Sequence, residues 1–286
     1  MKATMRTLLR QAKEGHFAIP AMNYLDFASA KAFLDASQEK NLPLILAFAE
    51  SHSKWLPLEE AARIGTYLQE CSKTPVVLHL DHGQTIAFIK KAILLGFNSV
   101  MIDASLDSFE ENVRKTKEIM AFAHKYGVDV EAEIGFVGAN ANLENHSVAG
   151  SVYTSLDNAC TFYQETQVDS LAISIGTAHG LYQGTPHIDF ARLAEISKAL
   201  PIPLVLHGGS SSGDGNLNRC AKNGISKINI FSDVISAAYK VKDNHDSKDY
   251  PTLVLGMQKA MKEVLLHYYD IFETQEVKNG KRGHQS

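Results

Sequence analysis

Acidic and imidazole side chains end several apolar stretches of this sequence, and such side chains can bind a metal ion or move a proton. The segment LHLDHG, residues 78–83, places Asp81 and His82 directly after an apolar run. Two interpretations are open, because buried polar groups are costly but are tolerated when they are hydrogen-bonded. His79 or His82 could be a core histidine with Asp81 in a turn, or the strand could deliver a metal ligand and an acid/base to a site.

The same pattern recurs along the chain, and its histidines suggest a metal. A single histidine or aspartate at the end of a strand is more often structural than functional. Three imidazoles at the ends of three separate runs, His82, His179 and His207, match the nitrogen set that binds Zn²⁺ and leaves one position open for substrate. Carboxylates alone would instead have favoured Mg²⁺. The other polar residues at the run ends are Asp81, Asp103, Glu131, Glu133, Asn229 and Ser232.

Short apolar runs alternate with amphipathic, helix-like stretches over the whole chain. About eight such runs are present: HFAIPAMN, LPLILAFA, TPVVLHLDHG, NSVMIDAS, VDVEAEIG, DSLAISIG, IPLVLHGG and KINIFSD. In a chain of 286 residues this alternation predicts one α/β domain, a (β/α)₈ TIM barrel over residues 1–286, with a flexible polar tail from about residue 274. A doubly wound open sheet is the alternative, but no G-x-G-x-x-G follows the first run.

The barrel prediction places the site and raises a geometric difficulty. The carboxyl ends of barrel strands carry the active site, so the polar residues should meet there. Neighbouring residues of a regular strand point to opposite faces, so only a break at Gly83 could bring Asp81 and His82 to the same mouth. Glycines also accompany the other histidines, in GTAHG and HGGS, and the last two strand ends lie where such barrels often hold a phosphate.

Composition excludes several classes of function. The chain is 45% hydrophobic and 21% charged with a net charge of -4, and its basic residues are scattered, so we expect no nucleic-acid partner. It lacks a signal-peptide pattern and a run of about 20 apolar residues, which predicts a cytoplasmic protein without a membrane partner. Its three cysteines form no CxxC pair, and a disulfide framework is not suggested.

Several segments together resemble the class II, zinc-dependent ketose-bisphosphate aldolases, the family of fructose- and tagatose-bisphosphate aldolases. The resemblance runs from about Asn23 to Asp233 and rests on LHLDHG, EAEIG, DSLAISIGTAHGLYQG, PLVLHGGSSSGD and KINIFSD in that order. It implies a carbon–carbon lyase that reversibly cleaves a ketose (bis)phosphate to dihydroxyacetone phosphate and an aldehyde through a metal-stabilised enediolate. Family members are usually homodimers or homotetramers and often need a monovalent cation, Na⁺ or K⁺.

The resemblance also assigns roles to residues of this chain. It implies that His82, His179 and His207 bind the catalytic zinc and that Asp81 moves the proton of the C4 hydroxyl. Chemistry agrees, since a carboxylate beside a dication stays ionised and can accept that proton. By the same carry-over Asp103 and Glu133 contribute to a second, more buried metal position. The implied contacts of the phosphorylated three-carbon half are Asn23, Gly180, Gly208, Gly209, Ser210, Asn229 and Ser232.

Three departures from the family pattern concern the substrate. Ala141 and Asn142 stand where a loop after EAEIG usually carries an acidic pair, and neither can move a proton at neutral pH. Ala49 replaces a common serine, and no arginine for the distal phosphate is evident in HDSKDYPTLVLGMQ. Bisphosphate specificity is therefore not expected. Glu144 is the nearest acid in the loop, either as a solvated charge or as a substitute proton carrier.

Two other functions stay open beside the aldolase. A barrel metallohydrolase could use three histidines to generate hydroxide, but it needs no pocket for a three-carbon phosphate. A non-catalytic relative that binds sugar phosphate or metal would explain the missing loop acids. The retained Asp81 favours catalysis.

Overall fold

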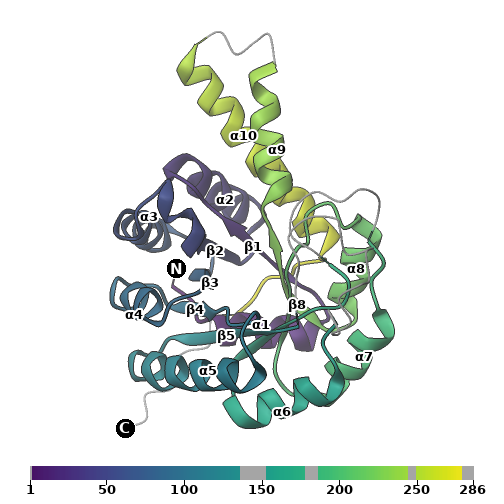
Figure 1. Ribbon diagram of the computed structural model, residues 1–286. Coiled ribbons are helices and arrows are strands. Elements are labelled where there is room, and N and C mark those ends of the chain that lie inside the picture. The colour runs from purple at the N-terminus through teal and green to yellow at the C-terminus, as the bar shows by residue number, and fades with distance from the viewer. Residues whose placement is uncertain (1, 136–152, 178–185, 244–248, 279–286) are drawn as a thin grey trace.

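Each predicted apolar run forms one strand, and the eight strands close into a parallel barrel in sequence order (Figure 1). The computed structural model describes residues 2–135, 153–177, 186–243 and 249–278. The (β/α)₈ prediction is confirmed. The strands are β1 (Ile19–Asn23), β2 (Leu44–Ala49), β3 (Val76–Gly83), β4 (Ser99–Ile102), β5 (Asp129–Ile134), β6 (Ser170–Ile173), β7 (Leu204–Leu206) and β8 (Ile225–Ile230).

Helices follow the strands and form the outer ring of the barrel (Figure 1). Many begin at a Thr, Ser or Asp whose side chain accepts a hydrogen bond from the first turn, as Thr85 and Asp249 do. The helices are α1 (Met5–Gly15), α2 (Phe27–Lys40), α3 (Leu58–Cys71), α4 (Ile86–Leu94), α5 (Phe109–Ala123), α6 (Leu156–Thr166), α7 (Phe190–Ala199), α8 (Asp214–Lys222), α9 (Ser232–Lys240) and α10 (Tyr250–Ile271). Short 3₁₀ turns are η1 (Glu50–Lys54), η2 (His124–Tyr126) and η4 (Val241–Asp243).

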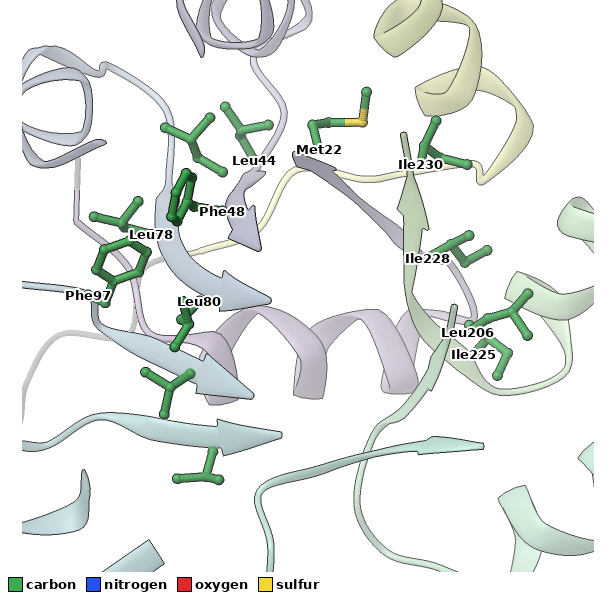
Figure 2. Close-up of a cluster of buried hydrophobic side chains, with 14 of the residues drawn as sticks. Met22, Leu44, Phe48, Leu78, Leu80, Phe97, Leu206, Ile225, Ile228 and Ile230 are labelled. Atoms are coloured by element: carbon green, nitrogen blue, oxygen red, sulfur yellow. The ribbon is translucent and has the colours of Figure 1, made fainter. Parts of the chain in front are cut away.

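The two faces of the barrel wall differ sharply in chemistry, because side chains alternate along a strand. One set of alternating residues points outward and packs under the helices in the main hydrophobic core, as Leu78, Leu80, Ile228 and Ile230 do (Figure 2). The other set faces the interior. The register joins inward-facing positions around the barrel, with His79 opposite Ser99 and Glu131 opposite Ser170.

The interior is apolar at the amino end of the strands and polar above it. Helix α1 lies across the amino end, and its Leu8 and Leu9 join Ile19, Ile45 and Val77 in a small separate core. This plug closes the amino end of the barrel and leaves the carboxyl end as the open one. The polar groups at the strand ends therefore lie at the open, carboxyl end of the barrel.

Two features at the periphery complete the fold. Helix α9 and the start of α10 extend beyond the barrel (Figure 1). Among the described helices, none has the length and apolar character needed to cross a membrane. Thr274 is buried and donates a hydrogen bond to the Ala18 carbonyl oxygen, and Val277 is buried as well. The expectation of a flexible tail therefore applies only beyond residue 278, outside the described residues.

Candidate active site

The break in β3 that brings Asp81 and His82 together lies at His82 itself. His82 has a φ of 45°, in the left-handed region, and the pairing of β3 with β4 shifts register between Leu80 and Gly83. This bulge turns His82 toward the barrel mouth while Asp81 keeps its inward direction. The prediction of a break was right, but its placement at Gly83 was wrong. Gly83 instead allows close packing, since a Cβ there would lie 2.6 Å from Ile89.

Two asparagine side chains hold the Asp81 carboxylate. The Asn23 amide donates to Oδ2 at 2.9 Å, and the Asn229 amide donates to Oδ1 at 2.8 Å. Burial alone would raise the pKa of Asp81, but the nearby His82 and Lys227 hold it well below its usual range. Asp81 is thus an oriented, ionised carboxylate. Asn23 and Asn229 were predicted as substrate contacts; both line the cavity described below, and both also position Asp81.

Two of the three predicted zinc ligands meet at the mouth of the barrel. His82 Nε2 and His207 Nδ1 lie 2.9 Å apart. The second nitrogen of each ring is held by a carboxylate: His82 Nδ1 donates to Asp103 at 2.7 Å, and His207 Nε2 donates to Glu131 at 2.9 Å. Such carboxylate–histidine pairs fix the ring orientation and the nitrogen offered to a metal.

A buried ion pair beneath the site supports His207. Lys227 Nζ donates to both oxygens of Glu131, at 2.9 and 2.8 Å, and both side chains are fully buried. His79 lies 3.3 Å from Lys227 Nζ, and its Nδ1 lies 2.9 Å from the Ser99 hydroxyl, so it is the satisfied core histidine that the sequence allowed. The sequence interpretation did not single out Lys227. The signal was a lysine in an apolar strand, two residues from Asn229 and on the same face.

Glu133 is the least satisfied acid of the site. It is buried, and no described residue makes a hydrogen bond to its Oε2. Burial, reinforced by the charge of Asp103, raises the pKa of Glu133 to about 8. An unpaired buried carboxyl is expensive unless a cation or a substrate group satisfies it. Its neighbours are the candidate ligands His82 and Asp103.

The donor set fits a divalent metal ion. Ligand atoms of Asp81, His82 and His207 lie within 4.8 Å of one another, as do those of His82, Asp103 and Glu133. Imidazole nitrogens with some carboxylate are the mixture that Zn²⁺ prefers, and the two groups share His82. The predicted third ligand, His179, lies outside the described residues, as do Gly180 and Glu144.

A cavity of about 580 Å³ opens above these groups. Gly208, Ser210 and Ser232 line it, as predicted for a phosphate subsite, and Ala49 lies in its wall. The Ser210 hydroxyl also accepts hydrogen bonds from the Phe231 and Asp233 amides, which ties the loop after β7 to the start of α9. Gly209 does not line the cavity; a Cβ there would lie 2.6 Å from Ile228, so it serves close packing.

The cavity also contains groups that the sequence interpretation missed. His52 and Phe231 line the wall beside Ala49, and Ser51 and Gln84 lie nearby on the same rim. His52 belongs to η1, in a segment whose sequence, ESHSK, looks like an ordinary polar turn. Only the packing of η1 against the barrel reveals that this histidine is buried.

Known proteins resemble the chain over almost its entire length. The family described as "Fructose-bisphosphate aldolase class-II" matches residues 3–277. The chain is 35% identical to a 6-phospho-5-dehydro-2-deoxy-D-gluconate aldolase of Halalkalibacterium halodurans, over 95% of this chain and 96% of that protein. It is 36% identical to a fructose-bisphosphate aldolase of Staphylococcus aureus, over 92% and 94% of the two chains.

A solved structure shows the same architecture. The crystal structure of the YdjI aldolase from Escherichia coli K12 superposes with a TM-score of 0.87 at 32% identity, and the match covers 96% of this chain and 98% of that one. Fold and sequence thus agree with the resemblance found in the motifs. The chain belongs to the class II fructose-bisphosphate aldolase family.

Proposed function

We propose that this protein is a zinc-dependent aldolase that reversibly cleaves a phosphorylated ketose to dihydroxyacetone phosphate and an aldehyde. The observation that carries the proposal is the oriented, ionised Asp81 beside His82 and His207 at the mouth of a cavity. We propose His82, His179 and His207 as the zinc ligands, with Asp103 and Glu133 at the alternative position of the ion. The bound zinc would supply Lewis-acid stabilisation of negative charge on the substrate oxygens.

Asp81 performs the proton transfer in this proposal. Its carboxylate accepts the proton of the C4 hydroxyl while the C3–C4 bond breaks and the C4 carbonyl of the aldehyde forms. Asn23 and Asn229 fix both oxygens of Asp81, so the group need not reorganise during the reaction. The bonding pair passes to the three-carbon half, which then takes up a proton at its C3. We propose Glu144 as the group that delivers that proton.

The phosphorylated half of the substrate is proposed to bind at the loop after β7 and the start of α9. Gly208, Ser210 and Ser232 line that part of the cavity, and amide groups of such turns suit an anion. Gly180 and a Na⁺ or K⁺ ion are further proposed contacts. We propose a ketose 1-phosphate rather than fructose 1,6-bisphosphate as substrate, because Ala49 offers no hydroxyl to a second phosphate.

We further propose that the protein is a homodimer or homotetramer. Helices α9 and α10 extend from the barrel and expose Tyr239, Tyr250 and Leu255. Exposed large apolar side chains on such an extension favour association with a second copy. Light scattering at micromolar concentration distinguishes a monomer from an oligomer.

Metal dependence and product formation test the function together. The protein is stripped with a chelator, reloaded with Zn²⁺, and offered dihydroxyacetone phosphate with a panel of aldehydes. We expect no product from the metal-free protein, recovery with Zn²⁺, and ketose 1-phosphates as products. Full activity without metal, or a lysine adduct trapped by borohydride, would overturn the zinc mechanism. Phosphate release without C–C bond formation would favour the metallohydrolase.

The role of Glu144 is tested in proton exchange between dihydroxyacetone phosphate and solvent, a half-reaction that needs no aldehyde. Wild type and Glu144→Gln are compared for deuterium exchange from solvent into dihydroxyacetone phosphate and for binding of this compound. We expect exchange to slow about 10²-fold or more, as for loss of a general acid/base, with binding little changed. Unchanged exchange would show that Glu144 is a solvated loop charge.

A further inference from the structure

The cavity has a second polar centre, His52, on the wall that η1 contributes. His52 is 7% exposed and lies among three aromatic rings. Ring centroids separate it from Phe231 by 4.8 Å, from Trp55 by 5.6 Å and from Phe48 by 6.2 Å. An imidazole in such surroundings is packed and held in place, so it can act as a fixed recognition group.

One polar atom of His52 is unsatisfied. Its Nδ1 is buried and has no hydrogen-bond partner among the residues that the structure describes. Leaving such a buried atom unpaired destabilises the folded protein. A leucine or phenylalanine would fill an aromatic wall without that cost. Nδ1 itself is closed off from the cavity, but His52 lines the cavity and its Nε2 is not among the buried unpaired atoms. A histidine therefore makes sense at this position if its ring hydrogen-bonds a molecule in the cavity.

The protonation state of His52 limits which ligand groups it can bind. Burial lowers the pKa of His52, and the positive charge of Lys54 opposes protonation further, while Asp81 acts in the other direction. A neutral imidazole offers one donor and one acceptor, which suits a hydroxyl group. It provides no positive charge for a phosphate.

The rest of the described wall agrees with an uncharged partner. Among the described residues that line the cavity, none is a lysine or an arginine. The nearest basic side chain in sequence, Lys54, has its Nζ 4.1 Å from the ring centroid of Trp55 and does not line the cavity. Phosphate groups are usually recognised by arginine or lysine. Around His52 the wall carries Ala49, Ser51 and Phe231.

We propose that His52 is a specificity-determining residue of the aldehyde subsite, where its imidazole hydrogen-bonds a hydroxyl of an unphosphorylated hydroxyaldehyde whose carbon chain packs on Phe231. The inference rests on the proposed aldolase function and deepens it by naming the class of the second substrate. Phe231 precedes Ser232 at the start of α9, so the wall for the aldehyde adjoins the proposed phosphate subsite.

The test compares aldehydes that differ in the hydroxyl and phosphate groups that His52 would contact. Wild type, His52→Leu and His52→Gln are assayed in the synthesis direction with dihydroxyacetone phosphate and glyceraldehyde, propanal or glyceraldehyde 3-phosphate. The surface variant His267→Gln, on α10 and far along the chain from the cavity wall, is the matched control. Deuterium exchange into dihydroxyacetone phosphate is measured for each, because this half-reaction needs no aldehyde.

We expect wild type to prefer glyceraldehyde to propanal by about tenfold or more in kcat/KM, as a site built to hydrogen-bond a hydroxyl does. The ratio of kcat/KM for glyceraldehyde to that for propanal should fall most in His52→Leu, fall partly in His52→Gln and stay unchanged in His267→Gln. Deuterium exchange should be equal in the four proteins. An unchanged ratio in His52→Leu would overturn the inference alone. A wild-type preference for glyceraldehyde 3-phosphate would overturn the inference and the proposed ketose 1-phosphate substrate, but not the aldolase reaction. Absence of exchange and of product in wild type would overturn the aldolase proposal and this inference together.

Discussion

Acidic side chains lie at both ends of the barrel, but they are hydrogen-bonded to very different degrees. At the amino end every oxygen of Asp169 has a hydrogen-bond donor, and Asp129 is paired with Arg6. At the carboxyl end three buried atoms have no hydrogen-bond partner within the described ranges, and their residues line the cavity: Glu133 Oε2, His52 Nδ1 and Asn229 Oδ1. Hydrogen-bonded polar groups stabilise a fold, whereas buried polar groups without a partner point to a site that binds a ligand.

The amino-end cluster joins elements that are distant in sequence. Asp169 Oδ1 accepts from the Arg6 guanidinium at 2.7 Å, and its Oδ2 accepts from His124 at 2.9 Å and from the Val130 amide at 2.8 Å. The Arg6 backbone amide also donates to Asp129 at 2.8 Å. These bonds attach α1 to the strands that it covers. Nothing in this cluster calls for an additional partner, and its role is structural.

The largest effect is expected for Asp81→Ala at the carboxyl end. Loss of the general base should lower kcat for ketose cleavage by about 10²–10⁴-fold, while zinc and dihydroxyacetone phosphate still bind. Steady-state kinetics and metal analysis of the purified variant measure both properties. A variant that is folded but has lost its metal would show instead that Asp81 is a ligand, which its closeness to His82 and His207 makes a real alternative.

Lys227→Met is expected to give the largest loss of stability. It leaves the fully buried Glu131 without its cation, and removing one partner of a buried pair costs about 3–5 kcal/mol. Urea unfolding of the metal-free protein measures the loss. The double variant Glu131→Leu, Lys227→Met removes both charges and should be more stable than the single variant. A single variant that unfolds like wild type would mean that Glu131 finds another partner.

The sequence predicted the skeleton of the molecule better than the details of its site. Strand and helix periodicity is local, so the eight strands and the plan of the barrel were predictable from the runs themselves. The proximity of Asp81, His82 and His207 was predictable because strand ends meet at one mouth. Lys227 and His52 were not, since their burial depends on which neighbours the closed barrel places around them. The bend at His82 could not be predicted from the sequence either, because a positive φ at a non-glycine residue is set by the surrounding structure.

Asp169→Ala should affect stability and leave catalysis unchanged. The substitution removes the acceptor of the buried Val130 amide, and an unpaired buried donor costs about 1–3 kcal/mol. The half-buried Asp35→Ala, which breaks an i,i+4 pair with Lys31 on the helix surface, is the control and should cost about 0.5 kcal/mol or less. Thermal unfolding and kcat/KM are measured for both. A large loss of activity in folded Asp169→Ala would show that the two ends of the barrel are coupled.

Glu133→Gln, at the carboxyl end, should stabilise the protein where Asp169→Ala destabilises it. It has the smallest effect expected among these substitutions. Its carboxyl group is buried with one oxygen unpaired among the described residues, and its raised pKa means that the folded protein holds it protonated near neutral pH. An amide of the same shape avoids the free-energy cost of that protonation. We expect the metal-free variant to be more stable than wild type by about 0.5–2 kcal/mol, the usual gain when a functional group is replaced by one that suits the fold. Zinc affinity should fall by about tenfold or more, as when a group close to a metal is altered. Urea unfolding without metal and zinc titration measure the two effects.

If Glu133→Gln instead destabilised the metal-free protein as much as Asp169→Ala does, Glu133 would be a structural acid like those at the amino end. The contrast between the two ends would then reflect only incomplete hydrogen bonding at the carboxyl end, and not a site built to receive a cation.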